Sequence, residues 1–349
     1  MLLYDLGKAP WAESQLIYHA LARLGREALV LVSPADPYVC VGFHQDATQE
    51  VDLTYCRAQD IPVFRREVGG GAVYLDHGQL FWQLVLKKDC PLVPGARQKF
   101  YEKFLAPVIN VYRALGMQAQ YKPVNDVLVG GRKVCGTGVG EIGDCLVCVG
   151  NIIRDFNYAA MARVLKVPDE KFRDKLHQGL EANLTTIKRE LGQAAYEHWD
   201  HAGLSGLLAD EFSGILGPLE RAEIDDELSA TMERLKERML DDGWLFLRRK
   251  VKDGRQVKLR HGVFVQQKMH KAPGGLLRAT FQTDDGRLGQ VFLSGDFFSY
   301  PPEAVEKLEA ALEGVSRDRV GSVISDFYAA QAWETPCVSV EDWLKVLSF

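Results

Sequence analysis

The sequence has no long hydrophobic run. Across its 349 residues, no apolar stretch approaches the roughly 18–20 residues that a membrane-spanning helix needs. Asp5, Lys8 and Pro10 interrupt the first segment before the hydrophobic core of a signal peptide develops. We therefore expect a cytoplasmic protein that has no membrane partner.

An excess of positive charge is also missing. Lys and Arg number 42 against 47 Asp and Glu, which gives a net charge of -5. That balance argues against a general nucleic-acid-binding protein, because such proteins are usually basic. The sequence shows no internal repeat or low-complexity tract, and its hydrophobic content of 47% is ordinary for a globular chain. At this length we expect two domains.

The motifs of the common nucleotide-binding folds are absent or incomplete. No G-x-x-x-x-G-K-[ST] phosphate loop is present, which argues against a P-loop kinase. Gly136, Gly138 and Gly140 approach the G-x-G-x-x-G fingerprint, but the third glycine comes one residue early and strand-like runs flank it. The eight histidines are scattered along the chain, so a zinc site is not expected either.

The seven cysteines are expected to be reduced thiols, because their number is odd and export signals are absent. Cys145 and Cys148 form a C-x-x-C pair inside an apolar, strand-like run, where residues i and i+3 point to opposite faces. This placement argues against a redox pair. A single cysteine nucleophile activated by His44 or His77 remains an alternative.

The most distinctive segment present is FRREVGGGAVYLD, which runs from Phe64 to Asp76. Arg65 and Arg66 precede three consecutive glycines, and strand-like runs lie on both sides. Consecutive glycines between two strands indicate that the backbone comes close to a ligand. The adjacent arginines indicate that this ligand is anionic.

A second glycine-rich segment, NDVLVGGRKVCGTGVGE, runs from Asn125 to Glu141. Its Gly130-Gly131 pair predicts a hairpin turn, and Lys133 follows among small residues. A lone lysine in a strand is usually a solvated edge residue. Together with the arginine pair, however, Lys133 predicts a composite site for a phosphate or a developing carboxylate.

The hydrophobic pattern predicts an α+β protein. A strand-rich part reaches about residue 190 and includes a long amphipathic helix at 97–115. Strand signals return after residue 244, with a hairpin turn in TDDGRL. We predict that this last part packs against the first. From about residue 157, charged helices are predicted over 157–165, 168–177, 193–216 and 219–242.

The two glycine-rich segments together resemble the lipoate–protein ligase family, in which R-R-x-x-G-G-G-A-V is followed by N-D and then by G-x-K-(V/I)-x-G-x-(A/G). The C-terminal KAPGGLLRATFQTDDGRLGQVFLSGDFF also looks like the small accessory domain of that family. The resemblance implies a class II aminoacyl-synthetase-like biotin/lipoate ligase fold with mixed and antiparallel sheets. The implied domains are a ligase-like catalytic domain at 1–190, a helical connection at 191–244 and a small α+β accessory domain at 245–349.

The activity implied by the resemblance is ATP-dependent formation of lipoyl-AMP, followed by transfer of the lipoyl group to a lysine of an acceptor domain. The implied cofactors are ATP, Mg²⁺ and lipoate. The implied partner is a lipoyl-acceptor protein domain, for example the lipoate-binding protein of a sulfur-oxidation pathway. Nucleic acid is not an expected partner.

The resemblance also implies roles for individual residues. Lys133 is the implied catalytic residue, and Asp126 is the implied Mg²⁺ ligand. Val73, Trp82 and Val139 are the expected lining of an apolar acyl slot. Residues of both segments would bind lipoyl-AMP: Arg65, Arg66, Gly69, Gly70, Gly71, Ala72, Val73, Asn125, Asp126, Gly136 and Gly138.

The sequence departs from the family pattern at two places. Leu75 stands where many of these ligases have a histidine, and Val149–Asn151 stand where they have a His-Gly pair. Two alternatives therefore stay open: a cysteine-dependent octanoyltransferase that uses Cys145 or Cys148, and a non-catalytic module that binds an acyl-adenylate. The sequence does not distinguish lipoate, octanoate and biotin as the substrate.

Overall fold

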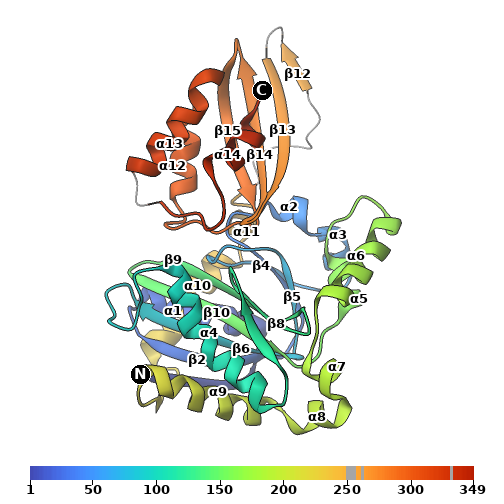
Figure 1. Cartoon of the computed structure of the whole chain (residues 1–349), viewed down its shortest axis with the longest axis vertical. Coiled ribbons are helices and arrows are strands. Elements are labelled where there is room, and N and C mark those ends of the chain that lie inside the picture. The colour runs from blue at the N-terminus through green and yellow to red at the C-terminus, as the bar shows by residue number, and fades with distance from the viewer. Residues whose placement is uncertain (249–256, 261–262, 331–332) are drawn as a thin grey trace.

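The computed structural model describes residues 1–248, 257–260, 263–330 and 333–349. Figure 1 shows a large sheet with its helices and, at one end, a smaller group of strands and helices in orange and red. We call this smaller group, from β12 (Val257–Arg260) to α14 (Val340–Leu347), the C-terminal unit. The mixture of helices with mixed and antiparallel sheets confirms the predicted α+β class.

The largest of the described sheets has eight strands, in the order β11-β1-β2-β6-β10-β9-β8-β7. At its centre, β6 (Gln79–Lys87) and β10 (Cys145–Ile153) pair antiparallel along their full length. Both strands are largely apolar and buried, because helices cover both faces of the sheet. The remaining strands are β1 (Leu2–Ala9), β2 (Ala28–Pro34), β7 (Ala119–Lys122), β8 (Asp126–Val129), β9 (Arg132–Ile142) and β11 (Glu220–Arg221).

Neighbouring residues of β6 show which helices cover which face, because successive strand side chains point to opposite sides. Gln83 donates a hydrogen bond to the Ser14 carbonyl of α1 (Trp11–Arg23) at 2.6 Å. Trp82 instead packs on Phe212 of α9 (His201–Leu216), with ring centroids 5.5 Å apart. Helix α4 (Arg97–Ala114) packs against α9 and confirms the predicted long amphipathic helix.

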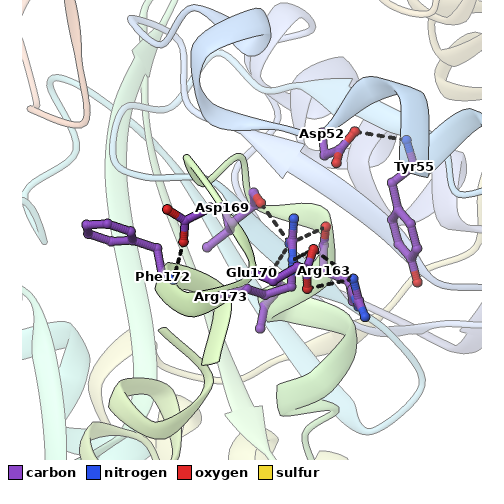
Figure 2. Close-up of polar contacts among 9 residues, drawn as sticks. Asp52, Tyr55, Arg163, Asp169, Glu170, Phe172 and Arg173 are labelled. Carbon is purple, nitrogen blue, oxygen red and sulfur yellow. Dashed lines mark hydrogen bonds and ion pairs between the residues drawn. The ribbon is translucent and has the colours of Figure 1, made fainter. Parts of the chain in front are cut away.

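A three-stranded sheet carries the first glycine-rich segment. Its order is β4 (Val63–Arg65), β3 (Tyr38–Val41) and β5 (Val73–Leu75), so the three glycines lie in the loop between β4 and β5. Two short helices, α2 (Ala47–Glu50) and α3 (Leu53–Ala58), connect β3 to β4. Asp52 caps α3, since its carboxylate accepts a hydrogen bond from the Tyr55 N–H at 3.0 Å (Figure 2).

The middle of the chain is helical, but two predicted boundaries are wrong. The single helix predicted at 193–216 is two helices, because Asp200 starts α9 by accepting a hydrogen bond from the Gly203 N–H. The helix predicted from 219 begins only at 226, because Glu220 and Arg221 form β11 beside β1. The helices here are α5 (Tyr158–Val164), α6 (Glu170–Asn183), α7 (Ile187–Leu191), α8 (Gln193–His198), α9, α10 (Asp226–Met239) and α11 (Asp242–Leu245).

Figure 2 shows the polar contacts at the start of α6. Asp169 accepts a hydrogen bond from the Phe172 N–H at 3.0 Å and so caps the helix. Glu170 forms ion pairs with Arg163 of α5 at 3.3 Å and with Arg173 at 3.2 Å. Because Glu170 is mostly exposed, each pair contributes less than about 1 kcal/mol, so the pairs mainly orient α6 against α5.

The C-terminal unit has its own hydrophobic core. Its described sheet has the order β12-β13-β14-β15, and Leu277, Leu293 and Trp343 are buried between this sheet and the helices. The hairpin turn predicted in TDDGRL is confirmed: Asp285 and Gly286 both have positive φ, 46° and 72°. The other elements of the unit are β13 (Val263–Ala272), β14 (Gly275–Asp284), β15 (Arg287–Gly295), α12 (Ala304–Ala311), η1 (Arg317–Arg319) and α13 (Val320–Ala330). None of the described helices is long and apolar enough to cross a membrane.

The C-terminal unit is docked directly on the glycine-rich segments. The Gly295 N–H donates to the His44 carbonyl at 3.0 Å, and the His44 ring stacks on Phe297 with centroids 5.0 Å apart. The Tyr300 hydroxyl donates to the Val139 carbonyl of β9 at 3.0 Å. Phe298 and Tyr300 pack into the core of the large sheet. The predicted packing of the last part of the chain against the first is therefore confirmed.

Candidate functional site

A cavity of about 390 Å³ lies where the C-terminal unit meets the large sheet. Gly69–Gly71 line it from the first glycine-rich segment, and Lys133, Gly136 and Gly138 line it from the second. The cavity continues across β10 and β6 to α1. The structure thus brings together the two segments that the sequence predicts to form one site.

Lys133 lies on β9 and points toward Asp126 of β8. Its Nζ is 2.6 Å from the Asp126 Oδ1 atom. A β-bulge between these strands makes the contact possible, because the pairing shifts between Val127 and Leu128 and turns Lys133 to the face that Asp126 occupies. A Cβ atom at Gly136 would lie 3.2 Å from the Lys133 Cε atom, so this glycine leaves room for the lysine.

Asn125 fixes the chain that leads into β8. Its side-chain amide donates to the Thr137 carbonyl, and the Thr137 hydroxyl donates back to the Asn125 carbonyl at 2.5 Å. On the other side of β9, Asn151 of β10 accepts a hydrogen bond from the Gly136 N–H at 2.9 Å. These contacts hold the backbone around Lys133 in place, and Asn125, Thr137 and Asn151 all line the cavity.

The glycine loop between β4 and β5 is held close to its neighbours. Gly70 has a φ of +89°, which favours glycine, and a Cβ atom at Gly42 would lie 1.9 Å from the Gly70 carbonyl oxygen. A Cβ atom at Gly138 would meet the Val68 side chain at 2.9 Å. Close packing of backbone on backbone therefore requires the glycines at these positions.

The two adjacent arginines have different surroundings. Arg66 lines the cavity and donates to the Gly69 and Gly71 carbonyls at 2.7 and 3.0 Å, so it fixes the glycine loop from inside. Arg65 does not line the cavity. Successive strand residues face opposite sides, and its side chain is fully buried on the side of α11.

The Arg65 guanidinium is bonded entirely to backbone carbonyls. It donates to the carbonyls of Gly42, Phe43, Trp244 and Leu245 at 2.7–3.2 Å, and the Trp244 indole N–H donates back to the Arg65 carbonyl. Burial, with a smaller effect of nearby Arg248, lowers the pKa of Arg65 to about 10. Its contacts are those of a structural cross-link between β4, the β3–α2 loop and α11.

Only some of the residues that were expected to form an apolar lining do line the cavity. Val73 lines the cavity, as do Leu75, Phe81 and Val149, which are apolar as well. Trp82 does not, because it points to the opposite face of β6 and packs on Phe212. Val139 and Ala72 do not line it either.

Polar side chains that the sequence analysis did not select line the inner end of the cavity. Gln15 and Tyr18 come from α1, Cys40 from β3 and Gln83 from β6. All four are buried, and buried polar groups in an otherwise apolar region usually have a specific role. The available sequence signal was a single polar residue, Gln83, inside the otherwise apolar run LFWQLVL.

Lys271, Asp296 and Phe298 of the C-terminal unit also line the cavity and were also missed. The Lys271 Nζ atom is 3.5 Å from the Asp296 Oδ2 atom, and the Phe298 ring lies against Gly70 and Gly138. The sequence resemblance predicts the KAPGG segment, which includes Lys271, only as part of an accessory domain. Contacts between segments so far apart in the chain leave no local pattern.

The two cysteines proposed as nucleophiles lie outside the cavity lining. Cys145 and Cys148 are buried in β10, and burial raises the pKa of both thiols. A thiol with a raised pKa carries little thiolate at neutral pH and is a poor nucleophile. His44, one of the two histidines proposed as the activating base, is buried against Phe297, and burial lowers its pKa well below the usual range.

The described residues contain no group of three or more His, Cys, Asp or Glu side chains that could hold a metal ion. Asp126 is a single carboxylate next to Lys133. Mg²⁺ in nucleotide sites is commonly held by one or two carboxylates together with substrate phosphates. Asp126 fits that arrangement and does not fit a metal cage made by the protein alone.

Comparison with known proteins gives consistent matches. Residues 8–213 match the family described as the lipoyl protein ligase A/B catalytic domain. The chain is 25% identical over 290 residues to lipoate–protein ligase 1 of Staphylococcus aureus, covering 81% of this chain and 79% of that protein. It is also 25% identical over 232 residues to octanoyltransferase LipM of Kyrpidia tusciae, covering 60% of this chain and 82% of that protein.

Two solved structures extend the comparison. One comes from the structural analysis of a bipartite lipoate protein ligase and its E2 lipoyl domain from Thermoplasma acidophilum. It is 25% identical, with a TM-score of 0.62, and covers 72% of this chain and 98% of that chain. P. falciparum LipL1 in complex with lipoate is similar in fold, with a TM-score of 0.72 at 14% identity over 99% of this chain and 97% of that one. These likenesses confirm the predicted type of fold.

Proposed function

The chain belongs to the lipoyl protein ligase A/B catalytic domain family, and from that membership we propose that it is an ATP-dependent lipoate–protein ligase. One observation carries the proposal. A single cavity is lined by Lys133, Asp126 and the glycine loop and also by the apolar side chains of Phe81 and Val149. This arrangement suits a ligand that has a charged phosphate–carboxyl junction and a medium-length acyl chain.

In the first proposed step, a carboxylate oxygen of lipoate attacks the α-phosphorus of ATP and pyrophosphate leaves. Negative charge accumulates on the phosphate oxygens, and Lys133 supplies a positive charge in a partly buried site, where it acts more strongly than in water. The N–H groups of the Gly69–Gly71 loop, fixed by Arg66, are proposed donors to the same anion. Mg²⁺ held by Asp126 and the ATP phosphates would neutralise part of the charge on the leaving pyrophosphate.

In the second proposed step, the ε-amine of an acceptor lysine attacks the carbonyl carbon of lipoyl-AMP, and AMP leaves. The carbonyl oxygen becomes negative in the transition state, and Lys133 is the proposed stabilising charge again. Asp126 holds the lysine amine in place before the ligand arrives, at a distance of 2.6 Å. Lys133 would thus serve both steps from one position.

The acceptor is proposed to be a lipoyl domain of a second protein, since the archaeal ligase structure was described with its E2 lipoyl domain. A sulfur-oxidation lipoate-binding protein as acceptor stays a prediction. For the domains, we propose that residues 1–190 carry the catalysis and that 245–349 act as an accessory domain. Residues 191–244 connect them, and their helices share the core of the large sheet.

Pyrophosphate release tests the proposed function. With Mg²⁺, ATP and a lipoyl domain present, we expect lipoate to cause pyrophosphate release and the lipoyl domain to gain the mass of one lipoyl group. Octanoate and biotin, measured side by side, show which acid is preferred. If none of the three acids releases pyrophosphate, the proposal is wrong, and the chain is either a non-catalytic module or the octanoyltransferase considered next.

An octanoyltransferase is the second candidate, because the chain is similar to octanoyltransferase LipM. The burial of Cys145 and Cys148 argues against this activity. Neither thiol lines the cavity. We therefore expect Cys145→Ala and Cys148→Ala to keep pyrophosphate release within about twofold of the unaltered chain. Incubation with octanoylated carrier protein is expected to leave the intact mass unchanged. A gain of one octanoyl group that either substitution removes would establish the transferase instead. Thermal melting of both variants checks that they fold.

A further inference from the structure

Gln83 of β6 carries an unpaired hydrogen-bond acceptor at the inner end of the cavity. Its side chain is 1% exposed, and its Nε2 atom donates to the Ser14 carbonyl at 2.6 Å. Because a carbonyl only accepts, this bond fixes which end of the amide faces Ser14. The Oε1 atom is buried and has no hydrogen-bond partner among the residues that the structure describes.

The polar groups around Gln83 offer it no donor. The Gln15 amide donates to the Tyr38 hydroxyl at 2.5 Å, and the Tyr18 hydroxyl donates to the Gln15 Oε1 atom at 3.2 Å. The Cys40 sulfur is 4.0 Å from the same Gln15 oxygen, and the Arg66 guanidinium donates to the Cys40 carbonyl and sulfur and to the Gly69 and Gly71 carbonyls. The donors described in this region are therefore directed at groups other than Gln83, which leaves the Gln83 acceptor available to a ligand.

Strand order relates Gln83 to Lys133. The side chains of Phe81 and Gln83 share a face of the sheet with their cross-strand partners Asn151 and Val149 of β10. Lys133 lies on β9, one strand further along. Gln83 pairs with Val149, which pairs with Gly138 of β9, and the Lys133 side chain reaches back along β9 to Gly136. Two strand spacings and two residues along the strand separate Gly136 from Gln83, which is about 12 Å. An acyl chain whose carboxyl group lies at Lys133 therefore passes the apolar Val149 and ends near Gln83.

We propose that Gln83 is a specificity-determining residue that accepts a hydrogen bond from the far end of the acyl chain. This inference rests on the proposed function and names its substrate more closely. To form this bond, the far end of the acyl chain must carry a hydrogen-bond donor. The reduced, dithiol form of lipoate carries two S–H groups there, whereas the cyclic disulfide and octanoate carry none. The preferred substrate is then the dithiol.

The experiment compares kcat/KM for pyrophosphate release by the full chain with four acids: dihydrolipoate, lipoate without reductant, octanoate and biotin. Octanoate is measured with and without reductant, which separates an effect on the enzyme from an effect on the substrate. We expect dihydrolipoate to exceed octanoate and the disulfide roughly 2- to 10-fold, the range of one net hydrogen bond when S–H is a weak donor. This comparison uses the unaltered chain and depends on no variant.

Two variants then locate the source of the preference. Gln83→Met keeps the length of the side chain but removes the acceptor, so the advantage of dihydrolipoate is expected to disappear, mainly through a higher KM. Cys40→Ala, in the same part of the cavity, is the matched control and is expected to keep the advantage. Loss of the preference in Cys40→Ala alone would assign it to thiol chemistry at Cys40 and overturn the proposal.

The outcomes separate this inference from the proposed function. Equal kcat/KM for dihydrolipoate and octanoate overturns the inference and leaves the ligase intact. A preference for biotin, whose ureido N–H groups also donate, overturns the dithiol assignment. Absence of pyrophosphate release with every acid instead overturns the proposed function.

Discussion

Lys133→Met is expected to lower lipoyl-adenylate formation at least about 100-fold, the usual cost of removing a charge that stabilises a transition state. Methionine keeps most of the length of the side chain and removes only the amine. Asp126 holds the Lys133 amine, whereas Lys271, a second lysine in the cavity lining, is paired with Asp296 and does not replace it directly. Pyrophosphate release and chromatographic detection of the adenylate measure the effect.

Lys88→Met is the matched control for this substitution. Lys88 is also a lysine in an ion pair, 2.9 Å from Glu141, but it lies outside the cavity lining. We expect it to form the adenylate normally. Thermal melting of both variants shows whether they are folded. Normal adenylate formation by folded Lys133→Met protein would remove Lys133 from the proposed mechanism.

Arg65→Met is expected to destabilise the protein by about 3–5 kcal/mol, because it leaves several buried carbonyl groups without donors. Those groups are the carbonyls of Gly42, Phe43, Trp244 and Leu245, and the arginine is fully buried among them. Chemical denaturation followed by circular dichroism measures the free energy of unfolding. A destabilisation of this size is a large fraction of the free energy of unfolding of a typical protein.

Arg66→Met provides the contrast. Arg66 is only partly buried and lines the cavity, where it holds the Gly69 and Gly71 carbonyls. Its loss is expected to reduce kcat/KM for pyrophosphate release more than it reduces the free energy of unfolding, because the glycine loop loses its support at the ligand. If Arg65→Met were as stable as the unaltered chain but lost ligand binding, the structural role assigned to Arg65 would be wrong.

The sequence predicted several features that are determined by residues close together in the chain. The Gly130-Gly131 turn is present, with φ of +55° and +80°, because a tight hairpin needs residues with positive φ. The long helix α4 also follows from its apolar periodicity, and it runs through Pro107 without ending. The two glycine-rich segments were found for the same reason, since consecutive glycines are rare except where backbone must approach something closely.

What the sequence did not reveal depends on long-range contacts. The sequence does not show that Arg65 and Arg66 have different roles. The difference arises because α11 lies behind β4, where its carbonyl groups accept hydrogen bonds from Arg65. The bulge that turns Lys133 toward Asp126 has no clear sequence signal. Nor does any local pattern place Lys271 or Phe298, more than 130 residues from Lys133 in the chain, in the same cavity as that lysine.

The cavity wall includes residues of both the large sheet and the C-terminal unit, and this has a thermodynamic consequence. A ligand that touches both the large sheet and the C-terminal unit binds more tightly when the two are docked. By linkage, it must then strengthen their docking by the same factor. A substitution at the contact between the large sheet and the C-terminal unit, such as in the His44–Phe297 stack, therefore changes ligand affinity without touching the ligand. The ligand affinity of this chain therefore depends on the contact between the large sheet and the C-terminal unit as well as on the residues that line the cavity.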